Sequence, residues 1–150
     1  MTIYIGADHR GFNLKECLKQ LLKDDAYDVV DVGAQQLVED DDYPDYASAV
    51  ATKVAVMPLE ARGIVICGSG FGVDIVANKF DGVRAGLATS PDHAYQGRHD
   101  DDINVLALAS DFVDEATAIK IMKVFLTTPF AKEEKYSRRL QKIAKIETMN

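Results

Sequence analysis

Residues 63–72, with the sequence GIVICGSGFG, combine a thiol with closely spaced glycines. An apolar β-type run ends at Cys67, and a helical pattern follows as far as Lys79. The glycines between them stand at alternate positions: Gly68, Gly70 and Gly72. Free backbone N–H groups and the dipole at a helix N-terminus favour negative charge on a ligand. We therefore expect Cys67 to act as a base or nucleophile beside an anion hole formed by the amides of Ser69, Gly70 and Phe71.

Two familiar phosphate-binding patterns are missing from this segment. Its glycines lack the G-x-G-x-x-G spacing of dinucleotide-binding folds, and no Gly-Lys-Ser/Thr follows as in a P-loop. The remaining alternative is a tight strand-to-helix turn that binds no ligand.

Polar residues also gather at other points of the chain. Asp8 and His9 follow the first predicted strand, where they would bind a polar ligand or where Asp8 would cap the next helix. His99 precedes three carboxylates: Asp100, Asp101 and Asp102. Such a run could bind a hard cation, but a solvated loop is the commoner use, and we predict no metal site. The acidic tract 39–42 is likewise interpreted as a solvated loop.

Strand-like and helix-like segments alternate along the chain. The expected strands are 3–5, 29–32, 64–67, 83–88 and 105–108. The expected helices are 12–23, 43–56, the segment up to residue 79, a segment near residue 94, 114–126 and 133–147. This alternation predicts an α/β fold with three α/β/α layers around a five-stranded parallel sheet, in one domain over residues 1–150.

Ligands of such folds bind outside the carboxyl ends of the strands. We expect four segments at that edge of the sheet: residues 8–9, 42–43, 67–72 and 90–102.

Composition narrows the class of function. The 150 residues carry a net charge of −7, which disfavours a nucleic-acid or anionic-membrane partner. No apolar run approaches the roughly 20 residues that span a bilayer, and no signal peptide is visible. Two cysteines are too few for a disulfide scaffold, so we expect a cytoplasmic protein.

Several of these stretches together resemble the type B ribose-5-phosphate isomerase and galactose-6-phosphate isomerase family. The matching segments cover nearly the whole chain in unbroken order: IGADHRGFNLKE (5–16), VVDVG (29–33), DYPDYA (42–47), GIVICGSGFG (63–72), ANK (77–79), GVRAGL (82–87) and NVLALAS (104–110). The resemblance implies a cofactor-free aldose–ketose isomerase of phosphorylated sugars. It also implies a homodimer or homotetramer whose active sites lie between subunits.

The same resemblance implies roles for individual residues. Cys67 matches the base that moves a proton between C1 and C2 of the open-chain sugar, and Ser69 with the glycine loop 68–72 would hold the enediolate oxygens. Asp8 and His9 match a substrate-binding pair, and Tyr43 lies in a segment that lines the pocket. The C-terminal helix would contact a neighbouring subunit, and its Lys135 and Arg139 are the nearest matches to two phosphate-binding arginines.

The chain departs from the family pattern before and after the fifth strand. Asp100 stands where the family has a ring-opening histidine, and Asp101 replaces the asparagine that follows it. Because His99 lies one residue earlier, either His99 or Asp100 would assist ring opening. Asp111 stands where the family has an arginine that contacts phosphate, and a carboxylate there would repel a phosphate dianion.

The sequence therefore leaves two functional hypotheses open. The leading hypothesis is a sugar-phosphate aldose–ketose isomerase, acting on ribose 5-phosphate or a related pentose or hexose phosphate, with Cys67 as base. The alternative is a non-catalytic or partner-dependent subunit of a hetero-oligomeric sugar-phosphate isomerase. A nucleotide-binding regulator is disfavoured because the phosphate-loop patterns are missing.

Overall fold

Short aliphatic runs form five parallel strands, which pair in the order β2-β1-β3-β5-β4 in the computed structural model, where residues 1–149 are described. The strands are β1 (Thr2–Ala7), β2 (Asp28–Asp31), β3 (Ala61–Cys67), β4 (Ala85–Leu87) and β5 (Val105–Ala109). The helices are α1 (Phe12–Asp24), α2 (Tyr43–Val56), α3 (Phe71–Ala77), α4 (Pro91–Asp101), α5 (Glu115–Thr127) and α6 (Glu134–Glu147).

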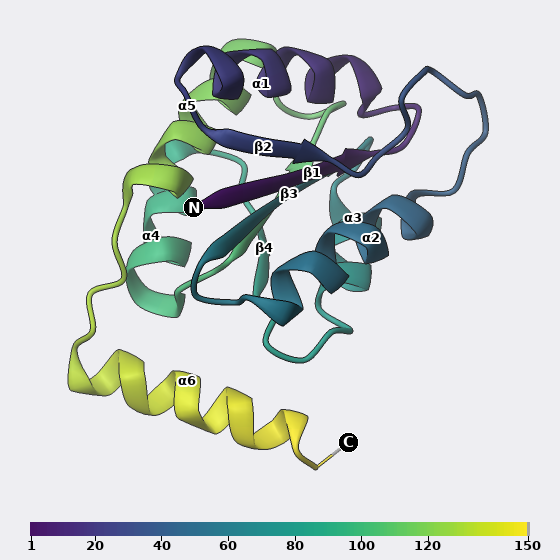
Figure 1. The fold of residues 1–150 in the computed structure, drawn as a ribbon. Coiled ribbons are helices and arrows are strands. Elements are labelled where there is room, and N and C mark those ends of the chain that lie inside the picture. The colour runs from purple at the N-terminus through teal and green to yellow at the C-terminus, as the bar shows by residue number, and fades with distance from the viewer. Residues whose placement is uncertain (150) are drawn as a thin grey trace.

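Helices cover both faces of the sheet, as the alternating pattern predicted (Figure 1). Residues of α1, α4 and α5 share one buried apolar cluster with Ile64 and Ile66 of β3. Residues of α2 and α3 share the other cluster with Val65 and Cys67. Neighbouring residues of a strand point to opposite faces, so the Cys67 side chain lies on the α2 and α3 side of the sheet. The predicted three-layer α/β/α fold is confirmed.

Two elements near β4 are shorter than the sequence predicted. The predicted helix end at residue 79 and the predicted strand 83–88 become an α3 that stops at Ala77 and a β4 of only three residues. Asn78 explains part of the difference, because its side-chain amide donates to the carbonyl of Ala85 at 3.1 Å and its Oδ1 accepts from the Ala85 N–H at 2.9 Å. These contacts connect the end of α3 directly to the start of β4.

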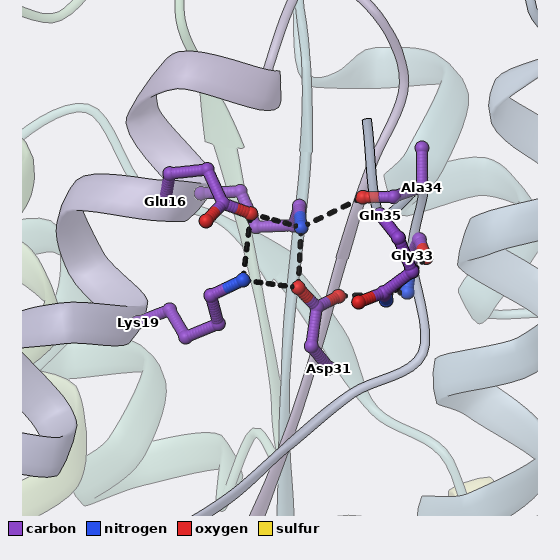
Figure 2. A network of polar contacts seen from close by, with 7 residues as sticks. Glu16, Lys19, Asp31, Gly33, Ala34 and Gln35 are labelled. Atoms are coloured by element: carbon purple, nitrogen blue, oxygen red, sulfur yellow. Dashed lines mark hydrogen bonds and ion pairs between the residues drawn. The ribbon is translucent and has the colours of Figure 1, made fainter. Parts of the chain in front are cut away.

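A buried lysine connects α1 to the end of β2. The Lys15 side chain is fully buried, and its ammonium donates to Glu16 at 2.7 Å, to Asp31 and to the carbonyl of Ala34 at 3.0 Å. Figure 2 shows Glu16, Lys19 and Asp31 turned toward one another around this position. Three acceptors match the three donors of an ammonium group, so the charge is satisfied inside the protein.

Helix α6 lies outside the three layers and runs alongside the body of the molecule (Figure 1). It contributes no buried residue, and it exposes the apolar residues Ile143 and Ile146. A groove of about 710 Å³ lies beside it, and residues of α6, β4 and α4 line this groove. The helix therefore has an apolar side that its own chain covers only in part.

Candidate active site

Cys67 ends β3 beneath the glycine loop 68–72. The residue is 4% exposed, and the backbone N–H of Gly70 donates to its Sγ at 3.2 Å. Gly70 has φ +75°, a conformation that favours glycine, and a Cβ there would lie 2.5 Å from the Leu87 side chain. The loop thus brings one amide donor onto the sulfur, while Ser69 and Gly72 are half-buried and Phe71 is exposed.

Asp8 belongs to the turn that follows β1, next to the end of β3. The residue is 4% exposed, and its Oδ1 accepts the N–H groups of Arg10 and Gly11 at 3.0 Å each. The N–H of Asp8 donates to the carbonyl of Ile66 at 3.4 Å, which sets this turn beside Cys67. Asp8 therefore shapes the turn before α1 but does not cap the helix, because the N-cap of α1 is Gly11 and it has no side-chain cap hydrogen bond.

His9 is held by Asp41, a residue that the sequence assigned to a solvated loop. A single oxygen of Asp41, Oδ1, accepts the His9 backbone N–H at 2.7 Å and contacts the ring Nδ1 at 2.8 Å. The Asp41 side chain is only 7% exposed, so the solvated-loop expectation is wrong for this residue. Because β1 and β2 are neighbours in the sheet, the loops that follow them meet at one edge.

Tyr43 links this group to the glycine loop. A Cβ at Gly72 would lie 2.6 Å from the Tyr43 ring, so the ring packs directly on Gly72. The DYPDYA and GSGFG segments are thereby in contact. Asp8, His9, Tyr43, Cys67 and the loop 68–72 all lie at the carboxyl edge of the sheet, as predicted.

His99, Asp100 and Asp101 lie at the opposite edge, which corrects the expectation that residues 90–102 gather at the carboxyl ends. Helix α4 starts at the carboxyl edge of the sheet but ends near the start of β5. There the carbonyl of Asn104 accepts from the N–H of Gly63 in β3 at 2.9 Å. A single chain therefore does not bring His99 or Asp100 to Cys67.

His99 belongs instead to a cluster formed with α6. Its ring stacks on Tyr95 with centroids 5.1 Å apart, meets the Tyr136 ring edge-on at 5.9 Å, and its Nδ1 lies 2.6 Å from Asp100 Oδ1. The hydrogen bond from His99 lowers the pKa of Asp100.

The two predicted cations of α6 border the same cluster. Lys135 lies over the Tyr136 ring at 4.6 Å and 3.3 Å from Glu133, and the Arg139 guanidinium lies 5.9 Å from that ring. The predicted site residues therefore form two groups at opposite ends of the molecule.

The third carboxylate of the acidic run is neutralised by arginines. Asp102 accepts from Arg84 at 2.9 Å and from Arg98 at 2.7 Å. Two guanidinium groups on one carboxylate disfavour a cation there, and Asp102 is paired inside the protein and not solvated as expected.

The unexpected carboxylate of Asp111 is also paired. Arg10 donates to Asp111, and a Cβ at Gly68 would fall within contact of the Arg10 guanidinium. The N–H of Asp111 donates to the carbonyl of Gly68 at 3.0 Å. The negative charge that the sequence placed at residue 111 is thus offset by a cation from the turn after β1.

Comparisons with known proteins show the family to which the chain belongs. A profile of the Ribose/Galactose Isomerase family matches residues 3–143. The chain belongs to this family. It is 41% identical over 146 residues to a protein of Mycoplasma genitalium named probable ribose-5-phosphate isomerase B, covering 97% of this chain and 95% of that protein. It is 36% identical to ribose-5-phosphate isomerase B of Mycobacterium tuberculosis, covering 98% of this chain and 90% of that protein.

Solved structures of the family superimpose closely. The crystal structure of the Mycoplasma genitalium enzyme with bound ribulose-5-phosphate gives a TM-score of 0.96 at 40% identity, over 99% of this chain and 97% of that chain. The Clostridium thermocellum ribose-5-phosphate isomerase B gives 0.94 at 39% identity, over 99% of both chains. The resemblance seen in the sequence and the enzyme class it implied, an aldose–ketose isomerase of sugar phosphates, are confirmed. Among residues 1–149, none of the helices has the length and apolar character of a membrane span.

Proposed function

We propose that this chain interconverts ribose 5-phosphate and ribulose 5-phosphate, with Cys67 as the base. The relatives that bear the name of this reaction match over nearly their whole length, which supports the choice of sugar. The proposed reaction needs three segments: the end of β3, the glycine loop and the Asp8–His9 turn. These segments contact one another in this chain.

The proposed chemistry is a proton transfer through an enediolate. The Cys67 sulfur, as thiolate, takes the proton from C2 of the open-chain aldose, and the C–H electron pair forms the C1–C2 double bond while the carbonyl oxygen gains negative charge. Ser69 and the amides of the loop 68–72 bind that oxygen. Return of the proton from sulfur to C1, with proton exchange between the two oxygens, gives the ketose and needs no cofactor.

The active site is completed, in this proposal, by a second copy of the chain. The observation that carries it is the separation of the two groups of site residues, with Cys67 at the carboxyl edge and His99, Lys135 and Arg139 near the amino edge and α6. The apolar side of α6 would be covered by the partner. A homodimer or homotetramer then has His99 or Asp100 of one copy assisting ring opening above Cys67 of the other.

Mixing two inactive variants tests the shared site. Cys67→Ala and Arg139→Gln each remove one half of every site in a homodimer. Random reassembly of equal amounts restores one intact site in the mixed dimers, about a quarter of wild-type activity. Reassembly of Cys67→Ala with itself is the control. Absence of recovery, with mixed dimers demonstrated by native mass spectrometry, contradicts a site built from two copies.

The departures at Asp100 and Asp111 favour one alternative, a subunit that needs a different partner chain for turnover. The purified chain alone, assayed with ribose 5-phosphate and with galactose 6-phosphate, decides between the two. Turnover by the homo-oligomer, unchanged by a chelator, supports the leading proposal. Activity that requires a second, related chain supports the alternative. We place the enzyme in the cytoplasm, where two unpaired cysteines are ordinary.

A further inference from the structure

Asp41 is buried within an otherwise exposed acidic tract. Its side chain is 7% exposed, whereas Glu39, Asp40 and Asp42 are exposed residues. Burying a carboxylate is costly unless it is paired and hydrogen-bonded. The structure pairs one oxygen of this carboxylate, Oδ1, with His9, which points to a specific use of this contact.

The contact fixes the His9 ring. Asp41 Oδ1 accepts the backbone N–H of His9 at 2.7 Å, and the ring Nδ1 lies 2.8 Å from the same oxygen. Since a carboxylate only accepts, Nδ1 carries a proton, and Nε2 on the opposite edge of the ring is left for a ligand. The His9 side chain is 29% exposed, so the ring is held yet accessible.

We propose that Asp41 is a positioning residue for substrate binding, which holds the His9 ring so that its Nε2 edge faces an oxygen of the sugar phosphate. This inference rests on the proposed function and deepens it, because it assigns a role to a residue outside the predicted site. Asp41 itself touches His9 and need not touch the substrate.

The charges around His9 all favour its protonated form. The hydrogen bond to Asp41 raises the pKa of His9, and the nearby carboxylates of Asp8, Asp41 and Asp40 raise it further, against the opposing effect of burial. From α2, Tyr46 and Asp45 lie near Asp41, and burial together with the Asp41 carboxylate raises the pKa of the Tyr46 phenol. Burial would raise the pKa of Asp41, but the two contacts with His9 and a hydrogen bond from Tyr46 lower it on balance.

Asp41→Asn is the test, with Asp40→Asn as the matched control. Asp40 is one residue away and exposed, and its φ of +57° is one that asparagine tolerates. The midpoint of the NMR titration of the His9 ring, assigned with His9→Gln, should move to lower pH in Asp41→Asn and move clearly less in Asp40→Asn, which loses a nearby charge but no hydrogen bond to His9. Loss of a hydrogen bond to a charged group should raise KM for ribose 5-phosphate about tenfold at pH 7.5 and leave kcat within about threefold.

The two readouts separate this inference from the proposed function. An unshifted His9 midpoint in Asp41→Asn, or an equal shift in Asp40→Asn, refutes the inference whether or not the chain turns over. A shifted midpoint with unchanged KM refutes it as well. A wild-type chain that fails to isomerise either sugar phosphate contradicts the proposed function, while the titration still tests the coupling. If Asp41→Asn does not fold, Asp41→Ser, which also removes the carboxylate, is measured in its place with the same two readouts.

Discussion

Replacing Lys15 with methionine tests the buried network that ties α1 to the end of β2. The substitution keeps the length of the side chain but removes the ammonium that contacts Glu16, Asp31 and the carbonyl of Ala34. Removing one member of a buried ion pair costs about 3–5 kcal/mol, because the partner charge is left uncompensated. Lys19 still contacts Asp31 at 2.7 Å, so we expect the lower end, about 3 kcal/mol.

Thermal unfolding followed by circular dichroism measures this cost. For a chain of this size the loss corresponds to a fall in melting temperature of roughly 10 °C. Protein concentration must be held constant, since assembly contributes to apparent stability. Lys23→Met, at an exposed position of the same helix, is the control and should change stability by less than about 1 kcal/mol. Equal melting temperatures for the two variants would show that the buried network contributes nothing to stability.

Three other substitutions test the partner Asp31 of this network and two contacts elsewhere. Burial would raise the pKa of Asp31, but Lys15, Lys19 and the Gly33 N–H lower it on balance. The ionised carboxylate therefore stabilises the fold above about pH 4, and this stabilisation is lost as pH falls below that value. The free energy of unfolding of Asp31→Asn should accordingly fall less steeply with acid than that of the wild type. Gly72→Ala, whose Cβ would lie 2.6 Å from the Tyr43 ring, should lower kcat/KM about tenfold or more, and an unchanged value would dissociate this contact from the site. The fully buried Asn104 accepts the Arg84 N–H at 2.8 Å, and Asn104→Ala should cost about 1–3 kcal/mol in urea unfolding, with a smaller loss contradicting its structural role.

Local patterns were enough to predict most of the fold. The apolar run that ends at Cys67 and the Tyr43–Pro44 helix start are short-range signals, and β3 and α2 begin or end at those residues. The end of α3 was not predictable in this way. It depends on the Asn78 side chain, which bonds to Ala85 in another element.

The sequence predicted which candidate site residues lie at the strand ends. It did not predict the contacts between side chains that are far apart in sequence. Asp41 is 32 positions from His9, and Asp111 is 101 positions from Arg10, so neither pair leaves a local pattern. The position of His99 was predictable from connectivity. A helix that leaves the carboxyl end of one parallel strand must return to the amino end of the next, and His99 lies just before β5.

Hydrogen exchange at C2 of the substrate is the most direct test of Cys67 as the base. Ribose 5-phosphate is incubated in deuterated buffer with wild type, Cys67→Ala, and Cys17→Ala as the matched control at the second free cysteine. A general base contributes about 10²–10⁴-fold, so Cys67→Ala should exchange at least 10²-fold more slowly, while Cys17→Ala exchanges like wild type. Exchange by folded Cys67→Ala at the wild-type rate would assign the base to another residue.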